Sequence, residues 1–220
     1  GMRYPQLLCL RIGTTVLLVA YARAAPAYTV TIAATAPKAV YLQVGVGSLT
    51  GASNYGNGGV PGNTATVNKA SVTVPAAALG NSTAQAMTTD SGVSQSSYDG
   101  YTYCTAGTQL YIGAFYRNPA ATGAAVLTAS VPAALTNATG NTIPFSQISW
   151  TSTGNGDTVA NGFLPEVFPG GTFVNGGIQN LGSVPLNRWA ESCWTFSYSN
   201  TLIPAVGTYT GRVVYTLTTP

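Results

Sequence analysis

Residues 208–218, TYTGRVVYTLT, carry the clearest strand pattern in the chain. Tyr209, Val213, Tyr215 and Leu217 fall at every second position, with Gly211 continuing their series, and polar residues occupy most of the positions between them. Successive side chains of a strand point to opposite faces of the sheet, so this pattern predicts a half-buried antiparallel strand.

The same alternation occurs earlier in the chain. In residues 189–198, Trp194, Phe196 and Tyr198 alternate with smaller side chains, and the segment that follows contains Pro204 and Gly207. The pattern predicts that this strand and the last one form a hairpin with a long turn. Other predicted strands cover residues 28–32, 40–46, 65–74, 97–104, 109–117, 124–131, 143–152, 172–174 and 178–184.

The fold class follows from these strands together with the residues between them. Glycine- and proline-rich stretches such as residues 51–62 separate the strands, and no helix-length window keeps an apolar stripe without interruption by Gly or Pro. The sequence therefore predicts an all-β protein, an immunoglobulin-like or Greek-key β-sandwich of about ten short strands.

The first 24 residues predict a secretory signal peptide. Arg3 and Arg11 accompany an uncharged core over residues 13–22, and this core is followed by a small-residue A-x-A pattern. A transmembrane helix is the alternative, but it needs about 20 apolar residues and the core has roughly half that number. We expect no integral membrane span after removal of the signal, and a single β-sandwich domain over residues 25–220.

The preferred cleavage site lies between Ala24 and Ala25, with cleavage after Ala27 as the second choice. Export predicts a secreted protein, located in the periplasm or on a bacterial cell surface. It also leaves Cys104 and Cys193 as the two remaining cysteines in an oxidising compartment, where we expect them to form a structural disulfide. Closing a loop of that length stabilises a fold by about 4 to 5 kcal/mol in chain-entropy terms.

Charge and composition exclude several classes of function. After signal removal the chain carries five basic and five acidic residues, so the basic pI of 8.8 belongs to the signal peptide. Without clusters of Lys and Arg, we expect no nucleic-acid binding. Charged residues make up 6% of the chain, against about a quarter in ordinary soluble domains.

The chain contains no histidine, which removes the commonest general base and metal ligand. We predict that the protein is not an enzyme and binds no cofactor. Glu166 and Glu191 are interpreted as buried partners of Arg188 or Arg212 rather than as a catalytic pair. Residues 153–158, TGNGDT, have the composition of a calcium loop, but one carboxylate favours a surface turn.

Aromatic residues offer one candidate binding site. Tyr101, Tyr103 and Trp150 are predicted as a platform on which sugar rings stack, and the alternative places such residues in the core and in cross-strand pairs. Surface carbohydrate is therefore one candidate partner.

Residues 207–217, GTYTGRVVYTL, resemble the closing strand of secreted bacterial fimbrial subunits, including chaperone-usher pilins and spore-coat-U-like proteins. The resemblance implies an incomplete immunoglobulin-like sandwich that is completed by an extended segment of a neighbouring subunit. Tyr28, Val30 and Ile32 would then belong to the donor strand; alternatively they form the first strand of a complete sandwich.

The leading hypothesis is a non-enzymatic cell-surface structural protein, similar to a pilus subunit, that assembles by β-strand addition with other fimbrial subunits or with itself. The alternative is a monomeric secreted carbohydrate-binding or adhesin module.

Overall fold

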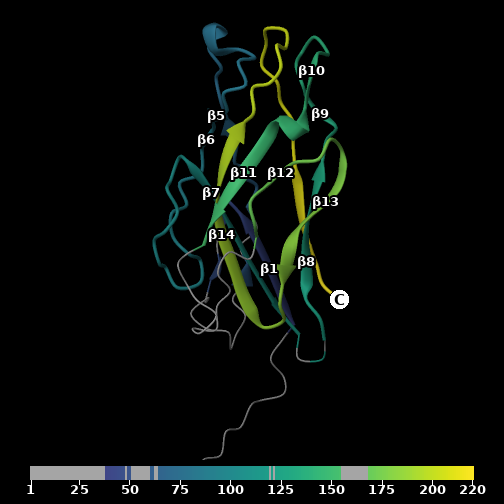
Figure 1. The fold of residues 1–220 in the computed structure, drawn as a ribbon. Coiled ribbons are helices and arrows are strands. Elements are labelled where there is room, and N and C mark those ends of the chain that lie inside the picture. Colours follow the sequence, from purple (N-terminus) through teal and green to yellow (C-terminus); the bar gives the residue numbers. More distant parts are fainter. Residues whose placement is uncertain are drawn as a thin grey trace, which may run out of the picture. The chain divides into compact units, whose positions relative to one another are not determined.

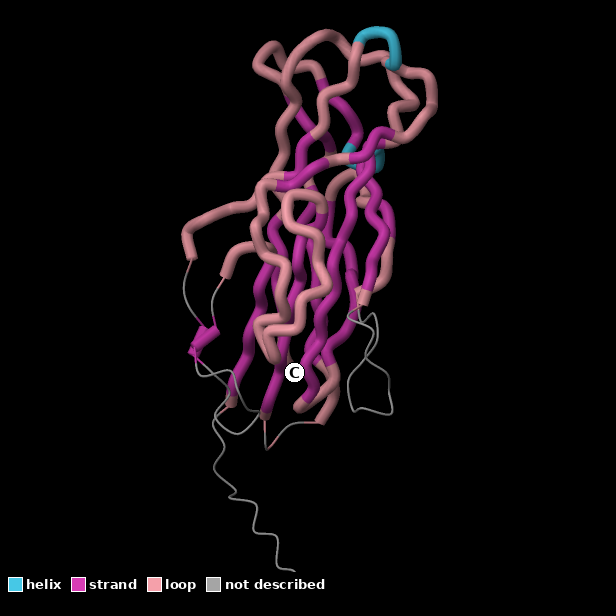
Figure 2. The backbone as a smooth tube through the Cα atoms, turned by 90° about the vertical axis from the view of Figure 1, so that its left-hand side faces the viewer, coloured by secondary structure: helices cyan, strands magenta, loops and turns pink. Residues whose placement is uncertain are grey.

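The computed structural model describes residues 38–47, 49–50, 60–61, 64–118, 120, 122–154 and 168–220, all within one compact unit. Nearly every described element is a strand or a loop, and the helical content is two short 3₁₀ turns (Figures 1 and 2). The prediction of an all-β sandwich is confirmed.

Fifteen strands occur in the described residues, and six of them span only two residues. The longer strands are β1 (Ala39–Val44), β7 (Gln109–Arg117), β8 (Ala125–Val131), β9 (Ala134–Thr136), β10 (Thr142–Pro144), β11 (Ile148–Thr153), β13 (Gly177–Val184), β14 (Arg188–Tyr198) and β15 (Val214–Thr218). The short strands are β2 (Leu49–Thr50), β3 (Val60–Pro61), β4 (Ala70–Ser71), β5 (Gln85–Ala86), β6 (Thr88–Thr89) and β12 (Gly171–Thr172), and the 3₁₀ turns are η1 (Ala76–Ala78) and η2 (Phe145–Gln147).

Two antiparallel sheets form the sandwich. The larger has the order β1-β7-β14-β11-β12, with β5 also paired to β14, and the smaller has the order β13-β8-β15. From β7 onward the chain passes from one sheet to the other at successive long strands: β7, β11 and β14 lie in the larger sheet, and β8, β13 and β15 in the smaller (Figure 1). Each sheet is therefore completed by strands that are distant in sequence.

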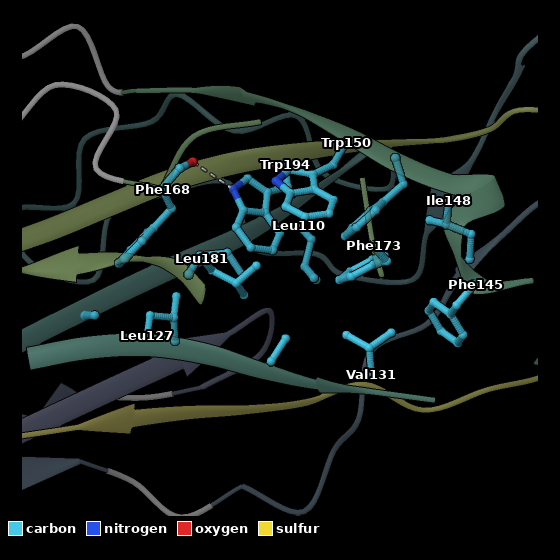
Figure 3. Packing of buried hydrophobic residues seen from close by; sticks show 14 of the residues in the cluster. Leu110, Leu127, Val131, Phe145, Ile148, Trp150, Phe168, Phe173, Leu181 and Trp194 are labelled. Atoms are coloured by element: carbon cyan, nitrogen blue, oxygen red, sulfur yellow. Dashed lines mark hydrogen bonds between the residues drawn. The ribbon is translucent and has the colours of Figure 1, made fainter. Parts of the chain in front are cut away.

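The main core lies between these two sheets (Figure 3). Leu110, Ile112 and Ala114 of β7 face it, and alternate residues of β14 do the same. Trp194 is fully buried, and its indole N–H donates to the Phe168 carbonyl at 3.2 Å. Burying large aromatic side chains supplies much of the stabilisation of such a core, provided that each indole N–H has an acceptor.

Several predicted strands are confirmed in their positions. Residues 109–117 form β7 with the predicted bounds, and β8, β13 and β14 begin within one residue of their predictions. Residues 143–152 do not form one strand, because a 3₁₀ turn after Pro144 separates β10 from β11.

Two predicted strands are wrong. Residues 65–74 contain only the two-residue β4, and the Asp90 side chain accepts the backbone N–H of Lys69 at 2.7 Å, which terminates the pairing. Residues 97–104 are a turn and a loop, in which the Ser96 hydroxyl accepts the N–H of Tyr98 at 3.1 Å and Gly100 has a φ of 77°. Local side-chain hydrogen bonds of this kind compete with a sheet ladder.

The predicted hairpin is also wrong. β14 pairs with β7 and β11 in the larger sheet, whereas β15 pairs with β8 in the smaller one. Asn200, which is fully buried with a φ of 54°, turns the chain away from β14. Its side-chain amide donates to the Ala78 carbonyl at 2.7 Å, so the segment between the two strands is held against the loop around η1.

Candidate functional site

β15 is an edge strand with a regular register. Its five residues pair one by one with β8, from Val214 opposite Ser130 to Thr218 opposite Val126, without a bulge. No strand within the described ranges pairs with its other edge. A row of main-chain donors and acceptors along such an edge is a template for another strand.

The side chains of β15 are only partly buried, as expected for a strand at the edge of a sheet to which another strand can be added. Tyr215 and Leu217 face the main core and are only half-buried, in contrast to Leu127 of the neighbouring strand, which is fully buried. Val214, on the opposite face, is 50% exposed. The predicted alternation is confirmed over Val214–Thr218, but the strand begins six residues later than predicted, since residues 208–213 lie outside it.

β1 borders the same side of the sandwich. It forms the edge of the larger sheet and lies close to β15 without pairing with it. Its residues Leu42 and Val44 pack against the main core but stay half-buried, and Val40 is 48% exposed. Apolar side chains that remain partly accessible therefore line both edges at this border.

The opposite edge of the smaller sheet, β13, is built differently. A bulge interrupts its pairing with β8 between Asn180 and Gly182, and the Gly182 N–H donates to the Asn180 side chain at 2.9 Å. Gly177, at the start of the strand, has a φ of 97°. Bulges and glycines make an edge a poor template for pairing, so β15 is the better candidate.

The disulfide predicted between Cys104 and Cys193 is present, with 5.6 Å between the Cα atoms. It fastens residues 94–104 to the face of β14 that points away from the main core. Within that segment the Ser96 N–H donates to the Tyr101 carbonyl at 2.8 Å, which folds it into a small hairpin. We call residues 94–104 the covering hairpin.

Glu191 is buried beneath the covering hairpin, with 4% of its surface exposed. Its carboxylate accepts hydrogen bonds from the Ser96 hydroxyl at 2.8 Å, the Tyr111 hydroxyl at 2.8 Å and the Trp189 indole at 2.6 Å. Neutral donors of this kind stabilise a buried carboxylate. The predicted burial of Glu191 is thus confirmed, and three of its hydrogen-bond donors are neutral side chains.

Two tyrosines near Glu191 are held in their protonated form. Burial raises the pKa of the Tyr111 phenol well above its ordinary value, and the adjacent Glu191 carboxylate raises it further. Burial also raises the pKa of Tyr41, whose hydroxyl donates to the Gln43 side chain. Both groups therefore act as hydrogen-bond donors, and their arrangement favours a structural role for the cluster.

A stack of aromatic rings lies on the same face of the larger sheet, near the start of β14. Trp189 lies between Tyr41 and Tyr98, with ring centroids 5.5 Å away on each side. Phe115 packs against the same indole. Since Tyr98 belongs to the covering hairpin, the stack and the disulfide hold the hairpin at two separate places.

The fold separates Trp150 from the other two residues of the predicted aromatic platform, since Trp150 is buried and Tyr101 is exposed. Trp150 is 5% exposed in the main core, where its ring packs on Phe173 and its indole N–H donates to the Pro169 carbonyl at 3.0 Å. It is therefore unavailable to a sugar ring, and its place in the platform was wrong. Tyr101 is 56% exposed and stacks on Tyr103 at 6.3 Å.

Several predictions fall outside the described residues. These are the cleavage site at Ala24 and Ala25, the donor residues Tyr28, Val30 and Ile32, and Glu166. Most of the 153–158 turn also lies there.

The described ranges lack two kinds of feature, a metal-binding group of side chains and a membrane-spanning helix. They contain no group of three or more His, Cys, Asp or Glu side chains placed to hold a metal ion. Within the same part of the chain, no helix has both the length and the apolarity needed to span a membrane.

The described part of the chain is thus an all-β sandwich with one disulfide, a covered polar cluster and an open edge at β15. Comparisons with protein-family models, with curated proteins and with solved structures found no match.

Sequence reasoning missed the cluster around Glu191, although the sequence of β14 contains a signal for it. Trp189 and Cys193 lie on one face of β14 and Trp194 and Phe196 on the other, so the strand is apolar on both faces. A strand with two apolar faces must be covered twice, and the covering hairpin provides the second cover.

Proposed function

We propose that the protein is an exported, non-enzymatic structural subunit that assembles by β-strand addition, and that the incoming strand pairs with the free edge of β15. The observation that carries this proposal is the regular, half-buried edge of Val214–Thr218, which no described strand covers.

Strand addition at this edge has a direct physical rationale. Main-chain hydrogen bonds along β15 supply affinity, and alternate side chains of the incoming strand supply register. An added strand also covers the half-buried apolar groups Leu217 of β15 and Leu42 of β1, which removes apolar surface from water. In the leading version of the proposal the donor is the segment with Tyr28, Val30 and Ile32 from another copy of the chain.

Two further features support export and a structural role. The Cys104–Cys193 disulfide suits an oxidising compartment, and Glu191 is buried beneath the covering hairpin, where its carboxylate accepts three internal hydrogen bonds. The resemblance of residues 207–217 to the closing strand of fimbrial subunits points in the same direction.

A matched pair of edge variants tests the proposal. Val214 on β15 and Ile178 on β13 both lie opposite Ser130, on the same face of the smaller sheet, and are 50% and 70% exposed. Lysine on an edge strand opposes pairing with another chain. We expect Val214→Lys to reduce assembly and Ile178→Lys to leave it unchanged.

The assay is the mass distribution of the exported, purified chain by light scattering, together with gels run with and without boiling. The proposal predicts heat-stable polymers for the unaltered chain and for Ile178→Lys, and a shift to monomer for Val214→Lys. A chain that stays monomeric at every concentration contradicts it, and so does equal assembly by both variants.

A further inference from the structure

A second surface of the larger sheet lies next to the covering hairpin, on the face that points away from the main core. Gln109 of β7, Thr195 of β14 and Thr151 of β11 form one cross-strand row, because Thr195 pairs with the other two residues. Thr153 lies two residues beyond Thr151 on the same face, and both of these threonines are exposed. We call these four residues the hydroxyl face.

The polar groups of the hydroxyl face are held in place by one another. The Gln109 side-chain amide donates to the hydroxyls of Thr195 at 3.1 Å and Thr153 at 3.4 Å, and its carbonyl accepts the Thr105 N–H at 2.8 Å. Gln109 is thereby fixed in one orientation. The Thr153 hydroxyl also donates to the Cys193 carbonyl at 3.4 Å, and the Thr195 hydroxyl keeps further donor and acceptor capacity. Such a face is ordered before any ligand arrives, which lowers the entropy lost on binding.

Exposed Tyr101 and partly buried Tyr103 belong to the same side of the sheet. Tyr103 packs edge-on against Tyr111 of β7 at 6.4 Å, and Tyr101 stacks on Tyr103. Tyr103 directly precedes Cys104, whose partner Cys193 lies opposite Thr153 in the β14–β11 register. The disulfide therefore anchors the tyrosine pair at the border of the hydroxyl face.

We propose that Tyr101 and the hydroxyl face together bind a neutral glycan. An accessible aromatic ring suits the apolar face of a sugar, and a row of hydroxyl and amide groups suits its hydroxyls. None of these five residues carries a charge, so the surface offers nothing to select an acidic polysaccharide. The strands of the row lie about 4.8 Å apart, which favours an extended chain of sugars over a single one.

This surface is distinct from the β15 edge, which belongs to the other sheet. It also differs from the platform predicted by sequence, since Trp150 is replaced by Gln109 and the threonines. Glycan binding and strand addition are therefore separable: the monomeric variant Val214→Lys is expected to bind glycan as well as the unaltered chain does.

The test is a pull-down of the exported, purified chain with insoluble neutral polysaccharides, namely cellulose, chitin and starch, and with pectate as an acidic comparison. We expect binding to at least one neutral polysaccharide. Tyr101→Ala, and separately the double variant Thr151→Ala with Thr195→Ala, should each weaken that binding at least tenfold, whereas Tyr101→Phe should retain it because stacking persists.

Thr216→Ala, an exposed threonine of β15 on the opposite sheet, is the matched control and should bind normally. Thermal unfolding of each variant separates loss of binding from loss of fold. The proposal is overturned if no neutral polysaccharide is bound, if pectate is bound in preference to all of them, or if folded Tyr101→Ala binds like the unaltered chain.

Discussion

Removal of the Cys104–Cys193 disulfide should destabilise the fold by an amount that the sequence separation sets. The bond joins residues 89 positions apart, and loop-closure entropy for such a separation corresponds to about 4.6 kcal/mol at room temperature. Most small domains have a total stability of about 5 to 15 kcal/mol, so the double variant Cys104→Ser with Cys193→Ser should lose a large part of it.

The loss should begin at the covering hairpin. Without the bond, that segment is held by ring contacts of Tyr98 and Tyr103 and by hydrogen bonds of Ser96 and Ser97 to the sheet. We therefore expect the surroundings of Trp189 to become exposed to solvent at lower denaturant concentration than the main core.

Equilibrium urea unfolding followed by tryptophan fluorescence measures the loss, with the oxidised chain as reference and the reduced unaltered chain as a second comparison. The urea midpoint should fall in the double variant and in the reduced unaltered chain. Each should have an unfolding free energy about 3 to 5 kcal/mol below that of the oxidised chain. A difference below about 1 kcal/mol would refute the reasoning, because it would mean that the bond does not restrict the unfolded chain as its loop length implies.

Other outcomes follow from the buried side chains. Trp150→Ala should lower the unfolding free energy by about 3 to 5 kcal/mol, measured by urea unfolding, because it opens a cavity in the main core. Unchanged stability would contradict the burial of Trp150. Asn200→Asp should destabilise by about 2 kcal/mol in the same assay, since it removes the donor to the Ala78 carbonyl, and an isoenergetic variant would contradict that role. Stability should also fall above pH of about 10: the pKa of Tyr111 is raised in the folded state, so its stabilising effect is complete below the unfolded pKa and is lost as pH rises toward the folded one. Unfolding midpoints across that pH range test this. Tyr111→Phe should make the fall less steep without abolishing it, because burial also raises the pKa of Tyr215.

The long strands were predictable because burial on one face or on both leaves a matching pattern of apolar residues in the sequence. β7 and β14 are covered on both faces, and β15 alternates between a half-buried and an exposed face, so each sequence keeps the signature of its position. The cysteine pairing was predicted from the number of cysteines and from the expected export of the chain.

The arrangement of strands into sheets was less accessible to sequence reasoning. β14 and β15 are neighbours along the chain and both alternate, which favours a hairpin by local rules, yet buried Asn200 turns the chain toward the other sheet. The pattern of one strand does not specify its partner, because pairing depends on contacts across the whole chain.

The polar cluster was hidden for a related reason. The donors to Glu191 include Ser96 and Tyr111, which lie 95 and 80 residues away from it in sequence. A serine in a loop and a tyrosine in a strand have no local feature that marks them as partners of a distant carboxylate. Trp150 shows the converse: the sequence placed it on a predicted strand, but only the packed structure shows that its side chain lies in the core.

Amide hydrogen exchange, compared between polymer and monomer fractions of the same preparation, tests most directly whether assembly occurs at β15. Strand addition predicts that exchange in the peptide over residues 213–218 slows markedly in the polymer, since its free edge gains hydrogen-bonded partners, while residues 177–183 of β13 exchange at the same rate in both fractions. Equal exchange of residues 213–218 in the two fractions, or protection confined to β13, would contradict strand addition at β15.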